Sequence, residues 1–155
     1  MTQRHSEYRR IANDVYVTPQ WTWEALHRVE PWSLEAWDCC PANPDFDLFD
    51  IHYNSRAGIA TNPPYGRLAE KIIRHSIELS KQVSGRVAML LPHAYDTART
   101  RVDLFKHLPF KRKWTLTRRI RWQNLEQKRA GPSSNHAWFV WDWKHIGPAT
   151  MGWLP

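Results

Sequence analysis

The sequence predicts an α/β fold in which helices cover the faces of a small sheet and an antiparallel hairpin lies at its edge. Three patterns support this prediction. An amphipathic helical pattern begins at Arg67, residues 86–92 form a continuous apolar run of strand length, and two apolar stretches near the C-terminus flank a polar loop. Residues 1–13 are polar and basic, which predicts a flexible arm, and residues 14–155 are of a suitable length for a single domain.

The first elements are an extended segment and a helix. The residue before Pro19 is held out of the α region, so residues 14–19 should be extended. A helix is expected from about Gln20, because apolar residues follow at spacings of three and four positions. Pro31 should end this helix, since proline removes a backbone hydrogen bond.

Residues 34–42 are expected to form the first central strand and its exit turn. No glycine occurs before Gly58, so this turn has no glycine-rich loop. The segment 41–59 that leads to the next strand is also short, because one crossover between parallel strands needs about a dozen residues. It has room for at most one short strand, which the alternating acidic and apolar residues 45–51 could form.

The centre of the sequence is the stretch Gly58–Gly66, which contains Asn62-Pro63-Pro64-Tyr65. Two consecutive prolines have a fixed φ and no N–H group, so they cannot lie inside a strand or helix. The stretch therefore predicts a rigid turn at the end of a strand, where open α/β sheets bind ligands. Its amide, carbonyls and aromatic ring could together hold an exocyclic amine and stack on a base. A surface turn without chemistry is the alternative.

An amphipathic helix should follow this turn and end before Gly85, and residues 86–92 should form a buried parallel strand. His93 and Tyr95 come next, at the same edge of the sheet as the proline turn. They could border a substrate pocket, although His93 could equally belong to a structural turn.

The C-terminal part should contain one more helix and a hairpin. Residues 97–108 have a helical pattern, residues 113–122 alternate apolar with polar side chains, and residues 136–141 form a final apolar strand. The polar, basic loop 124–135 joins the two strands, so we expect them to pair as a hairpin at the edge of the sheet.

The charge of the protein favours a partner that carries phosphate groups. The formal net charge is +7 and the sequence pI is about 9.7. Arg118, Arg119 and Arg121 lie among aromatic residues, and Lys128 and Arg129 lie in the basic loop. A solvated basic face is the alternative, but interleaved aromatic residues favour nucleic acid, and we assign these five residues to its binding.

The sequence argues against disulfides, metal sites and membrane segments. The two cysteines are adjacent, and the eight histidines form no two-histidine helical motif, so no metal site is expected. No segment has the apolar character of a signal peptide or a transmembrane helix. We therefore expect a cytoplasmic protein without a membrane partner.

The tetrapeptide Asn62–Tyr65 resembles the catalytic motif of S-adenosylmethionine-dependent amino-methyltransferases, which methylate N6 of adenine, some RNA bases and glutamine side chains. The chain is more narrowly similar to phage-type DNA adenine methyltransferases. Their closing hairpin resembles the Arg-Ile-Arg-Trp at 119–122 followed by the stretch 131–141. The resemblance covers about residues 14–143 and is weak between 41 and 58. It implies a reduced Rossmann-like methyltransferase sheet with S-adenosylmethionine as cofactor.

The resemblance also implies roles for individual residues. Asn62 and the Pro63 carbonyl would each accept one N–H of the target amine, and Tyr65 would stack on an adenine that is flipped out or single-stranded. Pro64 completes the catalytic motif, and no metal is required. The cofactor would be bound by Tyr16, Thr18, Pro19, Asp38, Cys40, Asp47 and Asn62. As alternatives, residues 16–19 could be an ordinary helix cap, and Asp45, Asp47 and Asp50 could face solvent.

Two competing interpretations follow from the same residues. The missing glycines and the short segment 41–59 favour a methyltransferase-derived protein that binds nucleic acid but is catalytically impaired, or a subunit completed by a partner chain. RNA or a glutamine side chain could also be the acceptor, because all three substrate classes share the tetrapeptide. The charge favours nucleic acid, DNA is our first prediction, and a homo-oligomer or a partner subunit stays open.

Overall fold

The structure is a computed structural model, and it describes residues 16–40, 58–124 and 134–155. Three sets of expectations lie outside these residues. They are the basic arm 1–13, the alternating segment 45–51 with Asp47, and the loop positions Lys128 and Arg129.

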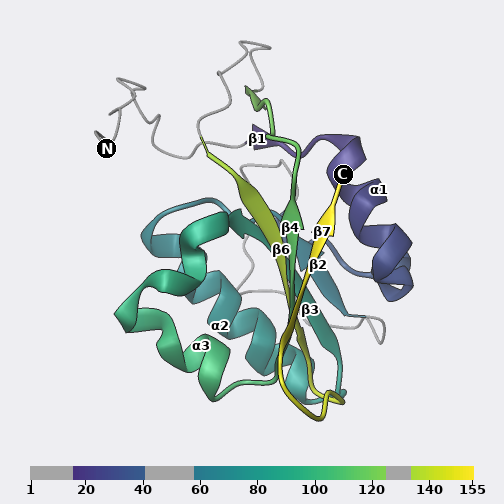
Figure 1. Ribbon diagram of the computed structural model, residues 1–155. Coiled ribbons are helices and arrows are strands. Elements are labelled where there is room, and N and C mark those ends of the chain that lie inside the picture. The colour runs from purple at the N-terminus through teal and green to yellow at the C-terminus, as the bar shows by residue number, and fades with distance from the viewer. Residues whose placement is uncertain (1–15, 41–57, 125–133) are drawn as a thin grey trace.

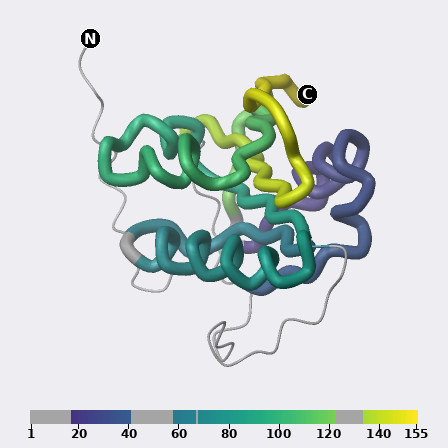
Figure 2. The backbone as a smooth tube through the Cα atoms, turned by 90° about the horizontal axis from the view of Figure 1, so that it is seen from below, coloured from purple at the N-terminus to yellow at the C-terminus, as the bar shows by residue number. Residues whose placement is uncertain are grey.

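A five-stranded mixed sheet forms the centre of the molecule, in the order β2-β3-β6-β4-β7 (Figure 1). The strands are β2 (Ile59–Thr61), β3 (Arg86–Pro92), β4 (Phe110–Leu116), β6 (His136–Asp142) and β7 (Thr150–Leu154). Helix α1 (Gln20–Val29) covers one face, and α2 (Arg67–Lys81) and α3 (Val102–Lys106) cover the other (Figures 1 and 2). A separate two-stranded ribbon pairs β1 (Tyr16–Val17) with β5 (Gln123–Asn124). The mixed α/β class is therefore confirmed.

The strand directions bring several chain segments to one edge of the sheet. Strand β2 is parallel to β3, β6 is antiparallel to both β3 and β4, and β7 is parallel to β4. Strands β2, β3, β4 and β7 therefore all end at the same edge, which we call the carboxyl edge. The proline turn leaves the sheet there after β2, and β6 starts there.

The two apolar faces of the sheet are filled by side chains that alternate along the central strand. Strand β6 is buried along its whole length, and Trp138 and Trp141 point to opposite faces. The indole N–H of Trp138 donates to the Thr22 carbonyl of α1 at 3.0 Å, and that of Trp141 donates to the Leu104 carbonyl of α3 at 2.8 Å. Both helices are thus anchored to one strand by hydrogen-bonded tryptophans.

Several elements were predicted correctly from local patterns. Helix α1 starts at Gln20 and ends before Pro31, helix α2 starts at Arg67, and β3 is the predicted buried strand. The apolar face of α2 lies in the core, with these residues buried: Ala69, Ile72, Ile73 and Ile77. Burial of this one face explains the periodicity seen in the sequence.

The expected position of the hairpin was wrong. Strands β4 and β6 pair antiparallel as predicted, but β6 lies in the middle of the sheet, between β3 and β4. The edge next to β4 is formed by β7, which the sequence analysis missed. In β7 the apolar Met151 and Trp153 are largely exposed and Gly152 lies between them, so the stretch has no apolar inward face by which the sequence would show a strand.

The first central strand is also smaller than expected. The chain forms a 3-10 helix at Pro31–Glu35 instead of entering a strand, and within the described residues 34–40 only Trp37 bridges Ile59 in parallel. Two backbone hydrogen bonds hold this bridge, from Trp37 N–H to Gly58 and from Ala60 N–H to Trp37, each of 3.0 Å. Pro31 suits the first turn of a helix, which explains why the chain turns here before it reaches the sheet.

The predicted helix 97–108 and strand 113–122 have different boundaries. Two 3-10 turns (His93–Thr97 and Arg99–Arg101) precede the short α3, and β4 begins at Phe110 and ends at Leu116. Residues 118–122 leave the sheet, yet Ile120 and Trp122 remain buried in the core. The alternation of apolar and polar side chains in this segment therefore reflects packing over the sheet edge rather than pairing in a strand.

Candidate functional site

The proline turn begins where β2 ends, at the carboxyl edge. Gly58 precedes the strand with φ +139°, and a Cβ there would lie 2.5 Å from the Arg86 carbonyl oxygen and 2.7 Å from the Trp32 ring. Only glycine fits this close approach of two backbones. Gly66, with φ +108°, ends the turn as the N-cap of α2. A glycine at each end thus fixes the strand–turn–helix unit that carries the tetrapeptide.

The carboxamide of Asn62 is held on one side and unpaired on the other. Its Nδ2 donates to the hydroxyl of Thr18 at 3.0 Å. Its Oδ1 is buried and has no hydrogen-bond partner among the described residues. Such a buried acceptor costs about 1–3 kcal/mol when it is left unsatisfied. The site therefore presents an acceptor suited to an N–H group of a ligand.

The segment Tyr16–Pro19 meets the tetrapeptide through Thr18. Strand β1 pairs Tyr16 with Asn124, and this ribbon leads directly to Thr18 beside Asn62. Pro19 is then the N-cap residue of α1, and its carbonyl accepts the Thr22 hydroxyl at 2.7 Å. The segment is thus a helix start that also lies beside Asn62.

Asp38 lies on the other side of the tetrapeptide. Its Oδ1 accepts hydrogen bonds from the Thr61 hydroxyl at 2.5 Å and from the Cys40 N–H at 3.1 Å. Although the residue as a whole is exposed, burial of the carboxyl group raises the pKa of Asp38, and these two hydrogen bonds oppose that shift. Because Thr61 directly precedes Asn62, the carboxylate is close to the tetrapeptide.

The adjacent cysteines lie in the same region, with their sulfur atoms 3.9 Å apart. Their hydrogen bond lowers the pKa of Cys40 and raises the pKa of the buried Cys39, so Cys40 is the thiol that ionises first. Both are free thiols.

Tyr65 is more deeply packed than a freely accessible stacking residue would be. Its ring stacks on His136 with centroids 5.7 Å apart, and it meets Trp122 edge-on at 6.1 Å. Burial raises the pKa of Tyr65 well above its ordinary value, and its hydroxyl has no partner among the described residues. A base that stacks on Tyr65 must therefore use the ring face opposite His136 or displace the imidazole.

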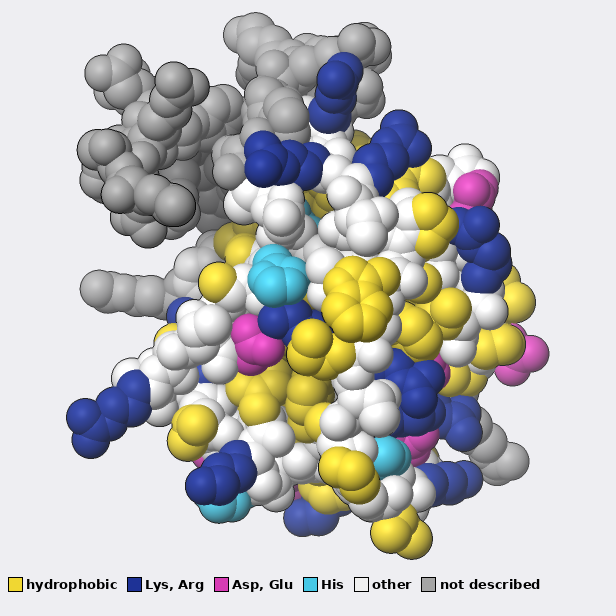
Figure 3. Space-filling model, in the orientation of Figure 1, with side chains coloured by type: hydrophobic (Ala, Val, Ile, Leu, Met, Phe, Trp, Pro, Cys, Tyr) yellow, Lys and Arg dark blue, Asp and Glu magenta, His cyan; other side chains and the backbone are white. Residues whose placement is uncertain are grey.

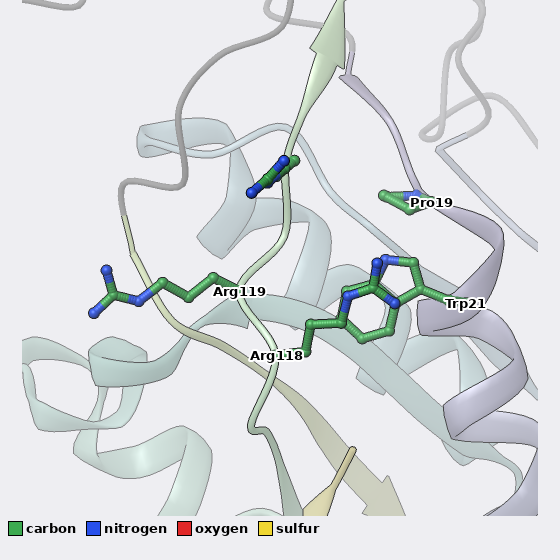
Figure 4. A pocket seen from close by; sticks show the side chains of 5 residues that line it. Pro19, Trp21, Arg118 and Arg119 are labelled. Atoms are coloured by element: carbon green, nitrogen blue, oxygen red, sulfur yellow. The ribbon is translucent and has the colours of Figure 1, made fainter.

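A cationic pocket lies at the carboxyl edge next to the N-terminal segment (Figure 4). It has a volume of about 550 Å³ and is lined by Pro19, Trp21, Arg118, Arg119 and Arg121. The Arg118 guanidinium lies 4.8 Å from the centre of the Trp21 ring, and Figure 4 shows it stacked over the indole while Arg119 points away. In the space-filling view, several dark-blue Lys and Arg side chains lie at the top of the molecule, and others lie on its right side and lower part (Figure 3).

The structure brings together some, but not all, of the residues that the sequence singled out. Thr18 contacts Asn62, Asp38 contacts the neighbouring Thr61, and Pro19 and the three arginines line one pocket. His93 is exposed, and its carbonyl accepts Lys113 Nζ at 2.8 Å, which fits a structural turn. Asp47, Lys128 and Arg129 lie outside the described residues.

Sequence analysis missed three residues of this region: Trp21, Thr61 and His136. Trp21 was expected on the apolar face of a helix, and Thr61 was part of the stretch Gly58–Gly66 without a role of its own. His136 was assigned to the final strand. Local patterns could not distinguish these roles, because each residue reaches the site through a neighbour that is distant in sequence.

Comparison with known proteins does not identify this chain: no protein-family model matches it, and no curated protein or solved structure does. In the described part of the chain, no group of three or more potential metal ligands comes together. None of the helices there combines the length and apolar character needed to cross a bilayer.

Proposed function

We propose that this protein transfers a methyl group from S-adenosylmethionine to the exocyclic amine of adenine in DNA. The observation that carries the proposal is the buried, unpaired Oδ1 of Asn62 at the carboxyl end of β2. The target amine offers N–H donors that match this acceptor. Because the Thr18 hydroxyl already engages Nδ2, the oxygen is the part of the carboxamide that is left for a substrate.

The side chains around Asn62 fit the proposed cofactor by their chemistry. A hydroxyl (Thr18) and a carboxamide (Asn62) meet at the carboxyl edge, and a carboxyl group (Asp38) is bonded to Thr61 on the other side of the tetrapeptide. Such groups suit a ligand with ribose hydroxyls and an amino-acid moiety. We assign cofactor binding to these residues and to Tyr16, Pro19, Cys40 and Asp47. When bound, S-adenosylmethionine would supply the electrophilic methyl group.

The chain itself would contribute positioning and electrostatics. Asn62 Oδ1 would accept one N–H of the amine and the Pro63 carbonyl the other, which fixes the direction of the nitrogen lone pair. Pro63 and Pro64 keep this turn rigid because their φ angles are fixed. Tyr65 would stack on the adenine at the ring face opposite His136.

Nucleic acid as the substrate is supported by the cationic pocket. Arg118, Arg119 and Arg121 follow β4 at the carboxyl edge, the same edge as Asn62. Guanidinium groups beside an aromatic ring are typical of surfaces that hold phosphates and stack on bases. Lys128 and Arg129 belong to the same proposed nucleic-acid surface.

The test is incubation with labelled S-adenosylmethionine and DNA, RNA or no acceptor, followed by nucleoside analysis. We expect label in N6-methyladenine from DNA. Label in RNA or in the protein would instead identify one of the alternative acceptor classes.

Asn62→Ala should reduce methyl transfer by at least about a hundredfold, comparable to losing one preorganised hydrogen bond at a reacting group. DNA binding should stay within a factor of about two, because the phosphate-binding groups are unchanged. Gln82→Ala, at an exposed position just after α2, is the matched control. Equal loss of transfer and binding in Asn62→Ala would mean that the turn is structural.

A second candidate is a methyltransferase-derived protein that binds nucleic acid without catalysis, alone or as a subunit. The specific observation in its favour is that, within the described residues 34–40, the expected first strand is reduced to one bridge between Trp37 and Ile59. Calorimetry with S-adenosylmethionine separates the candidates. The enzyme must bind S-adenosylmethionine, whereas the non-catalytic protein binds DNA but releases no heat of binding with S-adenosylmethionine.

A further inference from the structure

A second cavity lies on the other side of the tetrapeptide, at the start of α2. It has a volume of about 480 Å³ and is bordered by the first turn of α2 and by the segment that follows β3. Its walls include Tyr65, Gly66, Glu70, Tyr95 and Arg101. We call it the α2 cavity. The sequence-based expectations gave Tyr65 and Tyr95 a place beside the target base, but they assigned no phosphate to this region.

The α2 cavity gathers most of the unsatisfied polar atoms of the structure. Among the described residues, five buried side-chain polar atoms have no hydrogen-bond partner. Three of them, Tyr65 Oη, Tyr95 Oη and Arg101 Nε, belong to side chains that line this cavity. Folded proteins leave few such atoms unpaired, since each costs about 1–3 kcal/mol. Their concentration around one cavity points to a ligand.

The start of α2 adds backbone donors to the same cavity. This helix has 15 residues, and its N-cap Gly66 provides no side-chain cap. The first N–H groups of a helix have no partner within the helix, and the helix dipole places partial positive charge there. A Cβ on Gly66 would meet no atom within 4 Å, so open space adjoins the helix start. A helix end of this kind favours an anion.

The charged groups around the cavity nearly balance one another. Glu70 pairs with Arg74 at 2.8 Å and lies 3.6 Å from Arg101 Nε, and Arg74 also pairs with Asp103, so two guanidinium groups face two carboxylates. Arg101 stacks on the Tyr95 ring at 4.0 Å and donates through Nη1 to the Tyr95 carbonyl at 3.0 Å. The Arg101 guanidinium is thus held at the cavity wall before any ligand binds.

The groups of the cavity wall that lack a hydrogen-bond partner share one property: all of them can donate a hydrogen bond. The Arg101 N–H and the helix N–H groups are donors only, and the two phenol groups can donate. A ligand that complements them must be rich in acceptors and favoured by positive charge. A phosphate group meets both requirements better than a neutral base does.

We propose that the α2 cavity binds a phosphate group of the nucleic-acid strand that carries the target base. The identity of the strand rests on the proposed function, whereas the phosphate chemistry rests on the cavity alone. Because Tyr65 belongs both to the tetrapeptide and to the cavity wall, a phosphate bound here lies next to the nucleotide held by Asn62. The cationic pocket with Trp21 and Arg118 then binds a different part of the strand.

The test measures binding of a fluorescent single-stranded oligonucleotide to the full chain by anisotropy, with inorganic phosphate and adenosine monophosphate as competitors. Arg101→Gln should weaken oligonucleotide binding about 10- to 100-fold, as expected for one charged hydrogen bond. Arg99→Gln removes the same charge from an exposed position on the neighbouring 3-10 turn, and it should change binding by less than about twofold.

Tyr95→Phe provides a second variant that does not depend on charge. It should weaken binding about three- to tenfold, as for one neutral hydrogen bond, while the melting temperature stays equal or rises because an unsatisfied hydroxyl is removed. A lower melting temperature with unchanged binding would show that the hydroxyl is structural and would overturn the proposal. Equal effects of Arg101→Gln and Arg99→Gln would overturn it as well.

The remaining outcomes separate this proposal from the proposed function. Arg101→Gln could weaken the binding of inorganic phosphate or of adenosine monophosphate and leave oligonucleotide binding unchanged. In that case the ligand is a free phosphate compound, and the assignment to a strand is wrong. If the oligonucleotide depends on Arg101 but is never methylated, the cavity proposal stands and the methyltransferase proposal fails.

Discussion

The chemistry of Asn62 depends on the residues on either side of it and on one distant hydroxyl. Pro63 disfavours the α region for Asn62, because the proline ring crowds the residue that precedes it. The Thr18 hydroxyl accepts a hydrogen bond from Asn62 Nδ2 and leaves Asn62 Oδ1 unpaired. Sequence analysis identified Asn62 from its proline context, but the orientation of its carboxamide follows from a contact made across the fold.

His136 makes stability depend on pH. Burial lowers the pKa of His136 to about 4, although a hydrogen bond with the Ser134 backbone acts in the opposite direction. The ordinary pKa is about 6.5, so the unfolded chain binds this proton at a higher pH than the folded protein does. The contribution of the neutral His136 imidazole to the free energy of unfolding is therefore fully present above about pH 6.5. It is lost as the pH falls from 6.5 towards 4.

We expect the free energy of unfolding to fall by up to about 1.4 kcal/mol per pH unit across this window from His136 alone. Denaturant titrations at several pH values measure it. His136→Gln should flatten this part of the profile, whereas His107→Gln, at an exposed position, should leave the slope as in the wild type. An unchanged slope in His136→Gln would show that other groups cause the dependence.

At the scale of elements, the strand–turn–helix unit from β2 to α2 depends on its two glycines in different ways. Both have positive φ, but only Gly58 is crowded, with the Arg86 carbonyl and the Trp32 ring close to where a Cβ would lie. Gly66 adjoins open space. The first glycine therefore permits packing as well as backbone geometry, and the second permits backbone geometry alone.

This difference gives a paired prediction. Gly66→Ala should cost about 1–2 kcal/mol of unfolding free energy, from backbone strain. Gly58→Ala should cost about 3 kcal/mol or more, because overpacking adds to the strain. Chemical denaturation of the two variants measures both values. Equal costs would mean that the Trp32 ring and the β3 backbone move aside without penalty.

At the scale of the whole molecule, the sheet topology gathers positive charge and the tetrapeptide at one edge. The three arginines follow β4, and the amide of Asn62 follows β2, so both lie at the carboxyl edge although they are far apart in sequence. The opposite edge also carries exposed lysines, near the ends of α2, α3 and β6. Variants that remove the same number of positive charges from either edge can therefore be compared in their DNA binding.

The salt dependence of DNA binding should distinguish the two edges. One triple variant carries glutamine in place of Arg118, Arg119 and Arg121, and the matched control carries glutamine in place of Lys81, Lys106 and Lys144. The first should reduce the slope of log K against log salt by roughly 2–3, because each lost phosphate contact contributes about 0.7–0.9. The control should reduce it by much less. Equal reductions would show that net charge, rather than the carboxyl edge, drives binding.

The sequence by itself determined the elements that follow from local chemistry. The apolar periodicity of α1 and α2, the continuous apolar run of β3 and the prolines of the tetrapeptide each specify a conformation through their own neighbours. Sequence also placed Thr18, Asp38 and Asn62 among the candidate residues, through a resemblance rather than through geometry.

Only the tertiary structure decided which of these elements meet. The contact between Thr18 and Asn62 joins residues 44 positions apart, and the central place of β6 depends on pairing with two strands that precede it. The α2 cavity likewise combines the start of a helix with side chains that follow a different strand. Such arrangements follow from burying both faces of one sheet at once, a constraint that acts on the whole chain and leaves no mark in local periodicity.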